Sequence, residues 1–211
     1  MARMSLVRSL AVAAMLAPSM NAKAAANNDP DWPCIQRKVP QLSLGQIWNG
    51  PELPPAAKDL SKDPAVSALV AEVAARRLPI TEAQKKIRDF AAALPAEQLA
   101  PKMAMLVQGM FDHMDTERSH VISGIARYAH KQLEMAAALR KEASDVDALR
   151  EKPGADPDEV ERRTEQLKFA TRIFNERVQS LTYVCEVPTI IEQRLYQLSK
   201  VVSETLAAKK K

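Results

Sequence analysis

The residues best suited to chemistry are two histidines and two glutamates in the second half of the chain. His113, Glu117 and His120 are spaced four and three residues apart, so they share one face if this segment is helical. Glu117 and His120 form the Glu-x-x-His pair that carboxylate-bridged dimetal bundles use. Glu192 lies across from Glu117 if two helices pair antiparallel. Because zinc and copper both accept imidazole, the pattern indicates a candidate metal site.

Other features of the sequence favour a plainer interpretation of this face. A dimetal bundle needs a second such pair, and the remaining histidine, His130, has no glutamate three residues before it. Histidines and ion-paired glutamates are also common on the solvated side of long helices. Met110 and Met114 have the spacing of an ordinary helix core, although thioether ligands would suit copper. We therefore treat metal binding at these residues as an alternative to a structural or interaction role, and we expect no cofactor.

Catalytic motifs give no support to an enzyme, although that class stays open. The sequence contains no Gly-x-Ser-x-Gly nucleophile elbow and no glycine-rich loop that could bind phosphate. The two cysteines are better suited to a bridge than to nucleophilic catalysis. We therefore name no catalytic residue.

Two long helices are predicted at about 102–150 and 157–206, and they must position the candidate site. Apolar residues recur in steps of three and four along each, which indicates one continuous stripe per helix. Pro153 and Gly154 break the helix between them, and Asp156 with Pro157 is typical of a new helix start. Both stripes are buried if the helices close into an antiparallel hairpin paired as a coiled coil. Pairing across the turn places Cys185 near Gly124. The fold class is all-α.

Two shorter helices precede the hairpin and are expected to pack at its open end. Asp63 is the predicted N-cap of the first helix and Pro64 its first residue. Pro79 ends the apolar pattern that follows. Thr81 is the predicted cap of the next helix, which runs up to Pro95. The hairpin would then project from a small bundle.

The first residues, 1–24, have the pattern of a secretory signal peptide. Arg3 and Arg8 precede a short apolar core, and Ala22-Lys-Ala24 is a small-residue cleavage pattern. We divide the remainder into an extended Pro- and Trp-rich segment, 25–60, and a helical bundle and hairpin domain, 61–211. The tryptophans of the first part, Trp32 and Trp48, either cover an apolar face of the hairpin or line a ligand or partner groove.

The two cysteines predict a disulfide bond. An even cysteine count behind an export signal favours a bridge, because the compartments beyond the inner membrane are oxidising. Cys34 lies in the Pro-rich segment and Cys185 on the apolar stripe of the last helix. Their bond would hold the N-terminal segment across the middle of the hairpin, and closing so long a loop is worth about 5 kcal/mol in the chain-entropy model.

The charge and hydropathy of the chain argue against nucleic acid as its partner and against a membrane-spanning segment. The net charge is +4 for the whole chain and about +1 once Arg3, Arg8 and Lys23 leave with the signal, so nucleic acid is not the expected partner. No segment after the signal is apolar enough to cross a membrane. The sequence favours a periplasmic or secreted structural or interaction protein. The projecting hairpin would bind another protein, in the cell envelope or as a second copy, and a metal or small-molecule binder using His113, Glu117 and His120 is the alternative.

Overall fold

The computed structural model describes residue 29 and residues 31–208, and the predicted signal peptide lies outside these residues. Every regular element in this part of the chain is helical, which confirms the all-α prediction. Two single 3₁₀ turns, Pro55–Lys58 and Leu60–Lys62, lie between the first two helices. The α-helices, in chain order, are α1 (Leu44–Ile47), α2 (Pro64–Ala74), α3 (Ile80–Ala93), α4 (Ala96–Glu151) and α5 (Pro157–Ala208).

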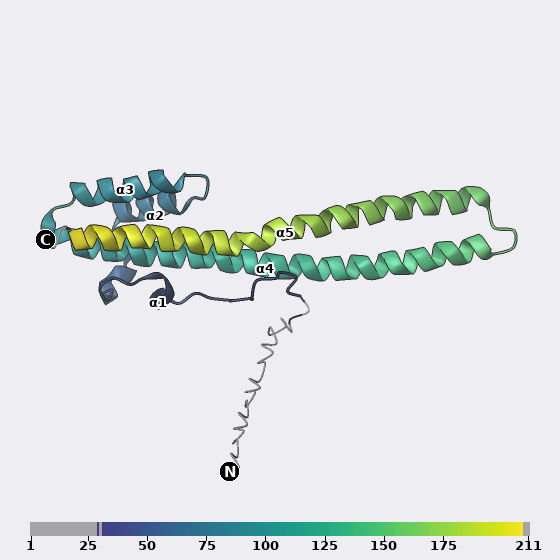
Figure 1. Ribbon diagram of the computed structural model, residues 1–211, viewed down its shortest axis with the longest axis horizontal. Helices are drawn as coiled ribbons and strands as arrows, with labels where there is room; N and C mark the ends of the chain where they lie inside the picture. The colour runs from purple at the N-terminus through teal and green to yellow at the C-terminus, as the bar shows by residue number, and fades with distance from the viewer. Residues whose placement is uncertain (1–28, 30, 209–211) are drawn as a thin grey trace, which may run out of the picture.

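Helices α4 and α5 form the predicted long hairpin, and the other helices lie beside one end of it (Figure 1). We call this end the base and the remainder the outer hairpin. Helix α4 begins at Ala96, earlier than predicted, and runs through Pro101 without a break. Proline lacks an N–H and cannot bond the carbonyl four residues back, but so near the N-terminus the helix loses a single bond. Burial of Leu99 favours the added turn, because this side chain joins the base core.

The sharp turn between the two arms follows the predicted chemistry. Gly154 has φ 75°, a left-handed conformation that glycine adopts without steric cost. The Asp156 carboxylate accepts a hydrogen bond from the backbone N–H of Asp158 at 3.0 Å, which satisfies one free donor at the start of α5. Pro157 takes the first helical position.

Contacts between the arms confirm the antiparallel register. Near the turn, the Arg163 guanidinium donates to the Glu142 carboxylate at 2.9 and 3.0 Å. Farther in, the Tyr128 hydroxyl lies 3.4 Å from the Arg177 carbonyl. Cys185 packs among residues of α4 on either side of Gly124, as the pairing predicts. Helix α5 bends in its middle (Figure 1), where Pro188 interrupts its hydrogen bonding.

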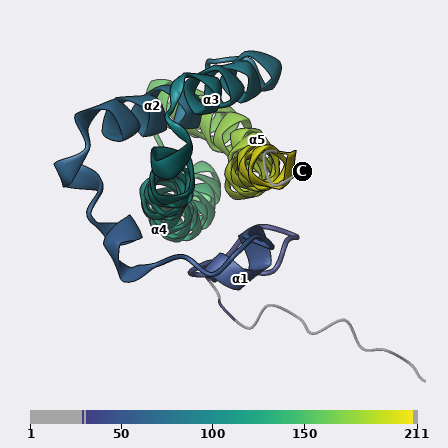
Figure 2. The same ribbon diagram turned by 90° about the vertical axis from the view of Figure 1, so that its left-hand side faces the viewer.

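Helices α2 and α3 cover one side of the base, α2 mainly on α4 and α3 on α5 (Figure 2). The Asp63 side chain caps α2 as predicted, accepting from the N–H groups of Ala65 and Val66 at 3.1 Å. The prediction that Thr81 caps α3 is wrong, because Pro79 occupies the cap position and Thr81 lies inside the first turn. Pro79 is extended, and its carbonyl accepts the first helical bonds of α3. A proline can therefore start the helix without a side-chain cap.

The apolar core is concentrated at the base. Met103, Met110 and Met114 of α4 are fully buried there, so these methionines fill the core. They pack with Ile191, Leu195, Leu198 and Val202 of α5 and with the inner faces of α2 and α3. A second, small cluster lies at the middle of the hairpin and consists of Trp32, Cys34, Ile122, Ile125 and Cys185.

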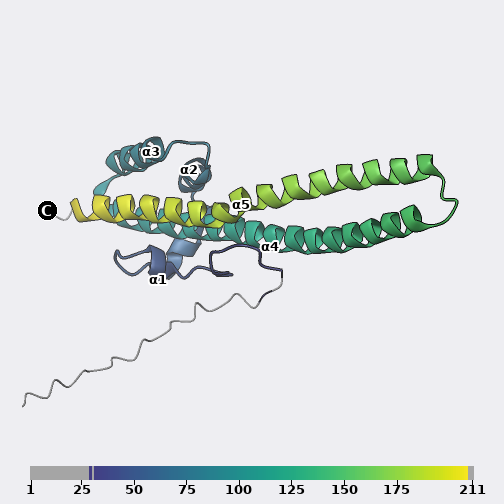
Figure 3. The same ribbon diagram turned by 45° about the vertical axis from the view of Figure 1, so that its right-hand side comes forward.

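The Pro- and Trp-rich segment runs along the side of the hairpin opposite α2 and α3 (Figure 3). It is held by side chains of α4: the Asp115 carboxylate accepts from the Leu42 N–H at 3.1 Å, and Arg118 donates to the Val39 carbonyl at 2.7 Å. Trp32 and Trp48 are both buried. The segment therefore covers apolar surface, as one of the two interpretations of its tryptophans predicts.

Candidate functional site

Arginine side chains pair with the two glutamates of the predicted metal site. His113 and His120 are both exposed on α4. Glu117 accepts from the Arg76 Nε of the α2–α3 connection at 3.0 Å. Glu192 lies 3.7 Å from the Arg118 Nε. Each of the two carboxylates therefore has a guanidinium group as its partner.

No three His, Cys, Asp or Glu side chains come together as a metal-binding group among residue 29 and residues 31–208. Sequence spacing placed His113, Glu117 and His120 on one helix but could not show the partners that α2 brings to them. Arg76 lies in the connection between α2 and α3, so its contact with Glu117 of α4 depends on how these helices pack together. The metal site stays a prediction, and its ligands are not assembled in this arrangement.

The disulfide between Cys34 and Cys185 is present, with an S–S distance of 2.03 Å and a Cα–Cα distance of 5.5 Å. It joins the N-terminal segment to the middle of α5. Two ion pairs involve acidic residues that precede Cys34 in the chain. Lys38 Nζ is 2.6 Å from Asp29, and His130 Nδ1 of α4 is 3.0 Å from Asp31. The hydrogen bond to Asp31 raises the pKa of His130, and the charges of Asp31 and Glu134 raise it further. Similarly, the hydrogen bond from Lys38 lowers the pKa of Asp29.

Arg194 is a structural residue that the sequence pattern did not reveal. It is buried on α5 although it lies one position away from the predicted apolar stripe, next to Leu195 in the chain. Its guanidinium donates to the Val73 carbonyl at 2.9 and 2.7 Å and to the Leu78 carbonyl at 2.9 Å. Burial lowers the pKa of Arg194, but an arginine stays protonated in proteins. The cation thus satisfies carbonyls at the C-terminus of α2 and in the following turn.

The outer hairpin has little core of its own. On α4, the only buried residues beyond Ala129 are Gln132 and Val146, and on α5 the described helix has none before Leu181. The two arms also run farther apart there than at the base (Figures 1 and 3). Large apolar side chains are instead exposed, namely Leu133, Phe169, Val178, Tyr183, Val184 and Ile190.

Two of these exposed residues, Tyr183 and Ile190, lie on one face of α5 with Val187 between them, which is partly buried and packs against the base core. Tyr183, Val187 and Ile190 are separated by four and three residues, and Arg194 follows four residues later, so all four lie on one helix face. Arg194 contacts the end of α2 and the turn after it. The face that α2 and α3 cover at the base therefore continues outward as Tyr183, Val187 and Ile190, which we call the α5 stripe. Tyr183 is 77% exposed and Ile190 47% exposed.

The end of the outer hairpin is charged and tied across its two arms. Arg163 joins Glu142 and lies 4.0 Å from Asp145, while Arg150 pairs with Asp147 at 2.9 Å. Residues 144–163 include seven acidic and four basic side chains, so this tip carries both signs of charge with an acidic excess. Such a surface is well solvated and can pair with either sign on a partner.

The fold and these surfaces define an all-α protein with a long helical hairpin to whose middle one disulfide ties the N-terminal segment. The chain matches no protein-family model, no curated protein and no solved structure. In the described part of the chain, none of the helices is both long and apolar enough to cross a membrane.

Proposed function

We propose that the protein is an exported scaffold that binds another protein of the cell envelope through its outer hairpin. The α5 stripe is the observation that carries this proposal. At the base the same face is covered by helices α2 and α3, and Tyr183 and Ile190 of the stripe are its exposed continuation. A helix of the partner could dock on the stripe in the way that amphipathic helices enter apolar grooves.

The energetics of the outer hairpin support docking there. Exposed apolar side chains gain about 25 cal/mol for each Å² that a partner removes from water. Aromatic anchors dominate such interfaces, and Tyr183 is the most exposed aromatic residue in the described chain. The charged tip at 144–163 would form the polar rim and set the orientation of the partner.

The bridge and the rigid base support a role outside the cytoplasm. A disulfide persists in oxidising compartments, which agrees with the signal peptide predicted for residues 1–24. The bridge fixes the N-terminal segment on one side of the hairpin, while α2 and α3 fix the other. The base thus leaves the outer hairpin as the part available to a periplasmic or secreted partner.

Co-purification from the exported fraction tests this proposal. A tagged chain is expressed in its source cells, and proteins recovered with it after mild crosslinking are compared for the wild type and for Tyr183→Asp. A charge on the stripe is costly to bury, so we expect the main partner to be lost. Tyr196→Asp is the matched control, because Tyr196 lies on the same helix at the base and is 48% exposed.

Both variants must keep the wild-type helical circular dichroism spectrum and the intact disulfide. Equal recovery of one partner by the wild type and by both variants would contradict docking on the α5 stripe. Recovery of a second copy of this chain alone would instead make the stripe a self-association surface, contradicting a different protein as partner.

A further inference from the structure

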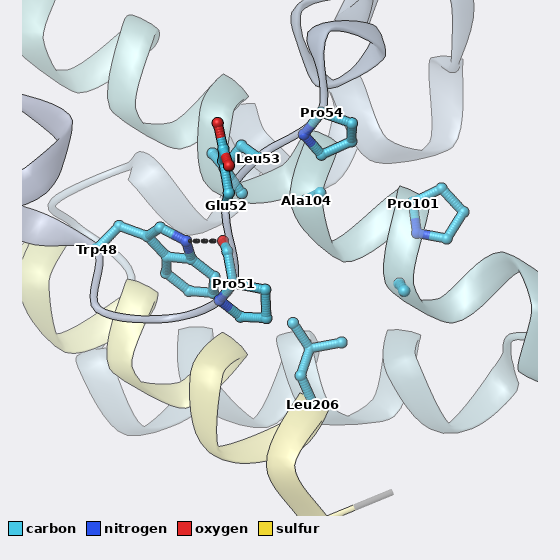
Figure 4. Close-up of a pocket in the computed structure, with 9 residues that line it drawn as sticks. Trp48, Pro51, Glu52, Leu53, Pro54, Pro101, Ala104 and Leu206 are labelled. Atoms are coloured by element: carbon cyan, nitrogen blue, oxygen red, sulfur yellow. Dashed lines mark hydrogen bonds between the residues drawn. The ribbon is translucent and has the colours of Figure 1, made fainter. Parts of the chain in front are cut away.

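A cavity of about 360 Å³ lies at the base, and Figure 4 shows the residues that line it. It opens between the segment after α1, the first turns of α4 and the end of α5. Its walls are almost wholly apolar and consist of Trp48, Pro51, Glu52, Leu53, Pro54, Ala100, Pro101, Ala104 and Leu206. The volume is near the lower end of the range of about 300–1,000 Å³ that small-molecule sites occupy.

The walls of this cavity are held in place. The Trp48 Nε1 donates to the Pro51 carbonyl at 2.7 Å, which fixes the indole at one side (Figure 4). A Cβ added at Gly50 would lie 2.1 Å from the Trp48 ring, so the chain passes close to the indole only because this residue is glycine. Pro51, Pro54 and Pro101 stiffen the backbone of two further walls. The indole cannot swing inward to fill the space without breaking these contacts.

The chemistry of the walls selects the kind of ligand. The three prolines have no N–H to offer, and the indole N–H is already used by Pro51. Glu52 is the one ionisable residue of the lining, and Figure 4 shows its carboxylate on the side of Leu53, away from Leu206. A polar or charged ligand would lose its hydration without gaining a partner. A hydrocarbon ligand has no hydrogen bonds to water to lose, and it gains contact with Trp48, Pro101 and Leu206.

We propose that this cavity binds a small uncharged ligand rich in hydrocarbon, with an aromatic ring against the Trp48 indole. The site is independent of the outer hairpin, so either proposal can fail without the other. The structure thus assigns Trp48 a second role besides covering the hairpin, namely the ring wall of a binding site.

Fluorescence titration with N-phenyl-1-naphthylamine, an uncharged probe, tests the proposal. In the Trp32→Phe chain Trp48 is the sole tryptophan, and we expect saturable quenching of its emission as the probe binds. Ala100→Phe places a ring in the cavity from an exposed wall position and should weaken binding about tenfold or more. Ala92→Phe, on the exposed side of α3, is the control and should leave the affinity unchanged.

A second probe tests the selectivity for an uncharged ligand. 8-Anilinonaphthalene-1-sulfonate has the same two ring systems with a sulfonate added, and we expect at least tenfold weaker binding at the Ala100-sensitive site. Binding of the uncharged probe that Ala100→Phe does not weaken would overturn the site. Equal Ala100-sensitive binding of both probes would overturn the uncharged ligand class. Gly50→Ala, which displaces the Trp48 ring, should also weaken the uncharged probe, and unchanged binding would contradict the preformed wall.

Discussion

Two arginines of the long hairpin are buried, and each donates hydrogen bonds to the backbone of a neighbouring segment. Arg118 is 3% exposed and bonds the Val39 carbonyl of the N-terminal segment, whereas Arg194 bonds carbonyls at the end of α2. A guanidinium offers five donors in a fixed plane, so one side chain can serve several acceptors. These residues therefore attach the flanking segments to the hairpin rather than forming a catalytic site.

Arg194→Met should destabilise the chain by about 2–4 kcal/mol, because the carbonyls of Val73 and Leu78 lose charged donors in a buried place. Urea denaturation followed by circular dichroism measures this loss. Lys200→Met changes an exposed cation on the same helix and should cost less than about 0.5 kcal/mol. An Arg194 variant as stable as the Lys200 variant would show that the guanidinium bonds contribute nothing.

The His130–Asp31 pair predicts a pH dependence with a definite sign. The pKa of His130 is raised, so the folded chain binds this proton more tightly than the unfolded chain. Its stabilisation is full below the ordinary histidine pKa of about 6.5 and is lost as the pH rises through the higher folded-state value. Because the imidazole is exposed, the effect on the free energy of unfolding is small.

Asp31→Asn should bring the pKa of His130 down toward its ordinary value, since it removes the largest cause of the shift. Proton NMR of the imidazole C–H signals against pH gives the two values. Glu134, 3.4 Å away, stays in the variant and keeps part of the shift. Identical titration curves in the two chains would show that the contact between Asp31 and His130 is not made in solution.

At the scale of the elements, few buried side chains join the two arms of the outer hairpin, and one of these side chains is polar. Gln132 is 5% exposed, and both polar atoms of its side chain lack a hydrogen-bond partner in the described chain. Burying an amide without a partner costs about 1–3 kcal/mol on the scale of protein mutations. The contact between the arms is thus weaker here than at the base, which contains most of the buried apolar residues of the described chain.

Gln132→Leu should stabilise the chain by about 1–2 kcal/mol, because it replaces the unpaired amide with an apolar group of similar size. Thermal and urea denaturation measure the change. Gln179→Leu, at an exposed position of α5, is the control and should be near neutral. A destabilised Gln132 variant would mean that the amide is satisfied in solution.

Loss of the bridge should act on the N-terminal segment first. Replacing Cys34 by serine and Cys185 by alanine opens a loop of 151 residues, with an expected loss of about 2–5 kcal/mol. We expect limited proteolysis to cut the segment near residues 33–40 while α4 and α5 stay intact. Reducing agent should reproduce this cleavage in the wild type and change nothing in the double variant. Equal protection of this segment in the wild type and the variant would show that Arg118 and Asp115 hold it alone.

The hairpin and its turn could be predicted from the sequence because they depend on local chemistry, and the bridge because the chain has only two cysteines to pair. The spacing of apolar residues, Pro153 with Gly154, and the even cysteine count all act within short stretches or by simple pairing. The earlier start of α4 could not be predicted, since burial of Leu99 against other helices outweighs the local effect of Pro101. The partners of Glu117 depended in the same way on where α2 brings Arg76.

At the scale of the whole molecule, core and exposed apolar surface are separated along one axis. The base contains the large core, and the middle is stapled by the disulfide cluster. The outer hairpin carries exposed apolar residues and a charged tip, with almost no core between its arms (Figure 1). A free-standing spur of this kind gives little to the stability of the base, and we infer that it is kept for contact with another molecule.

Site-specific photocrosslinking in the source cells tests that inference most directly. A photoreactive amino acid replaces Tyr183 in one chain and Tyr196 in another, so both positions lie exposed on α5 but on opposite sides of its bend. We expect one dominant crosslinked protein of the cell envelope from position 183, and we expect that protein to be absent from the products of position 196. No crosslinked protein from position 183, or the same product from both positions, would contradict the inference.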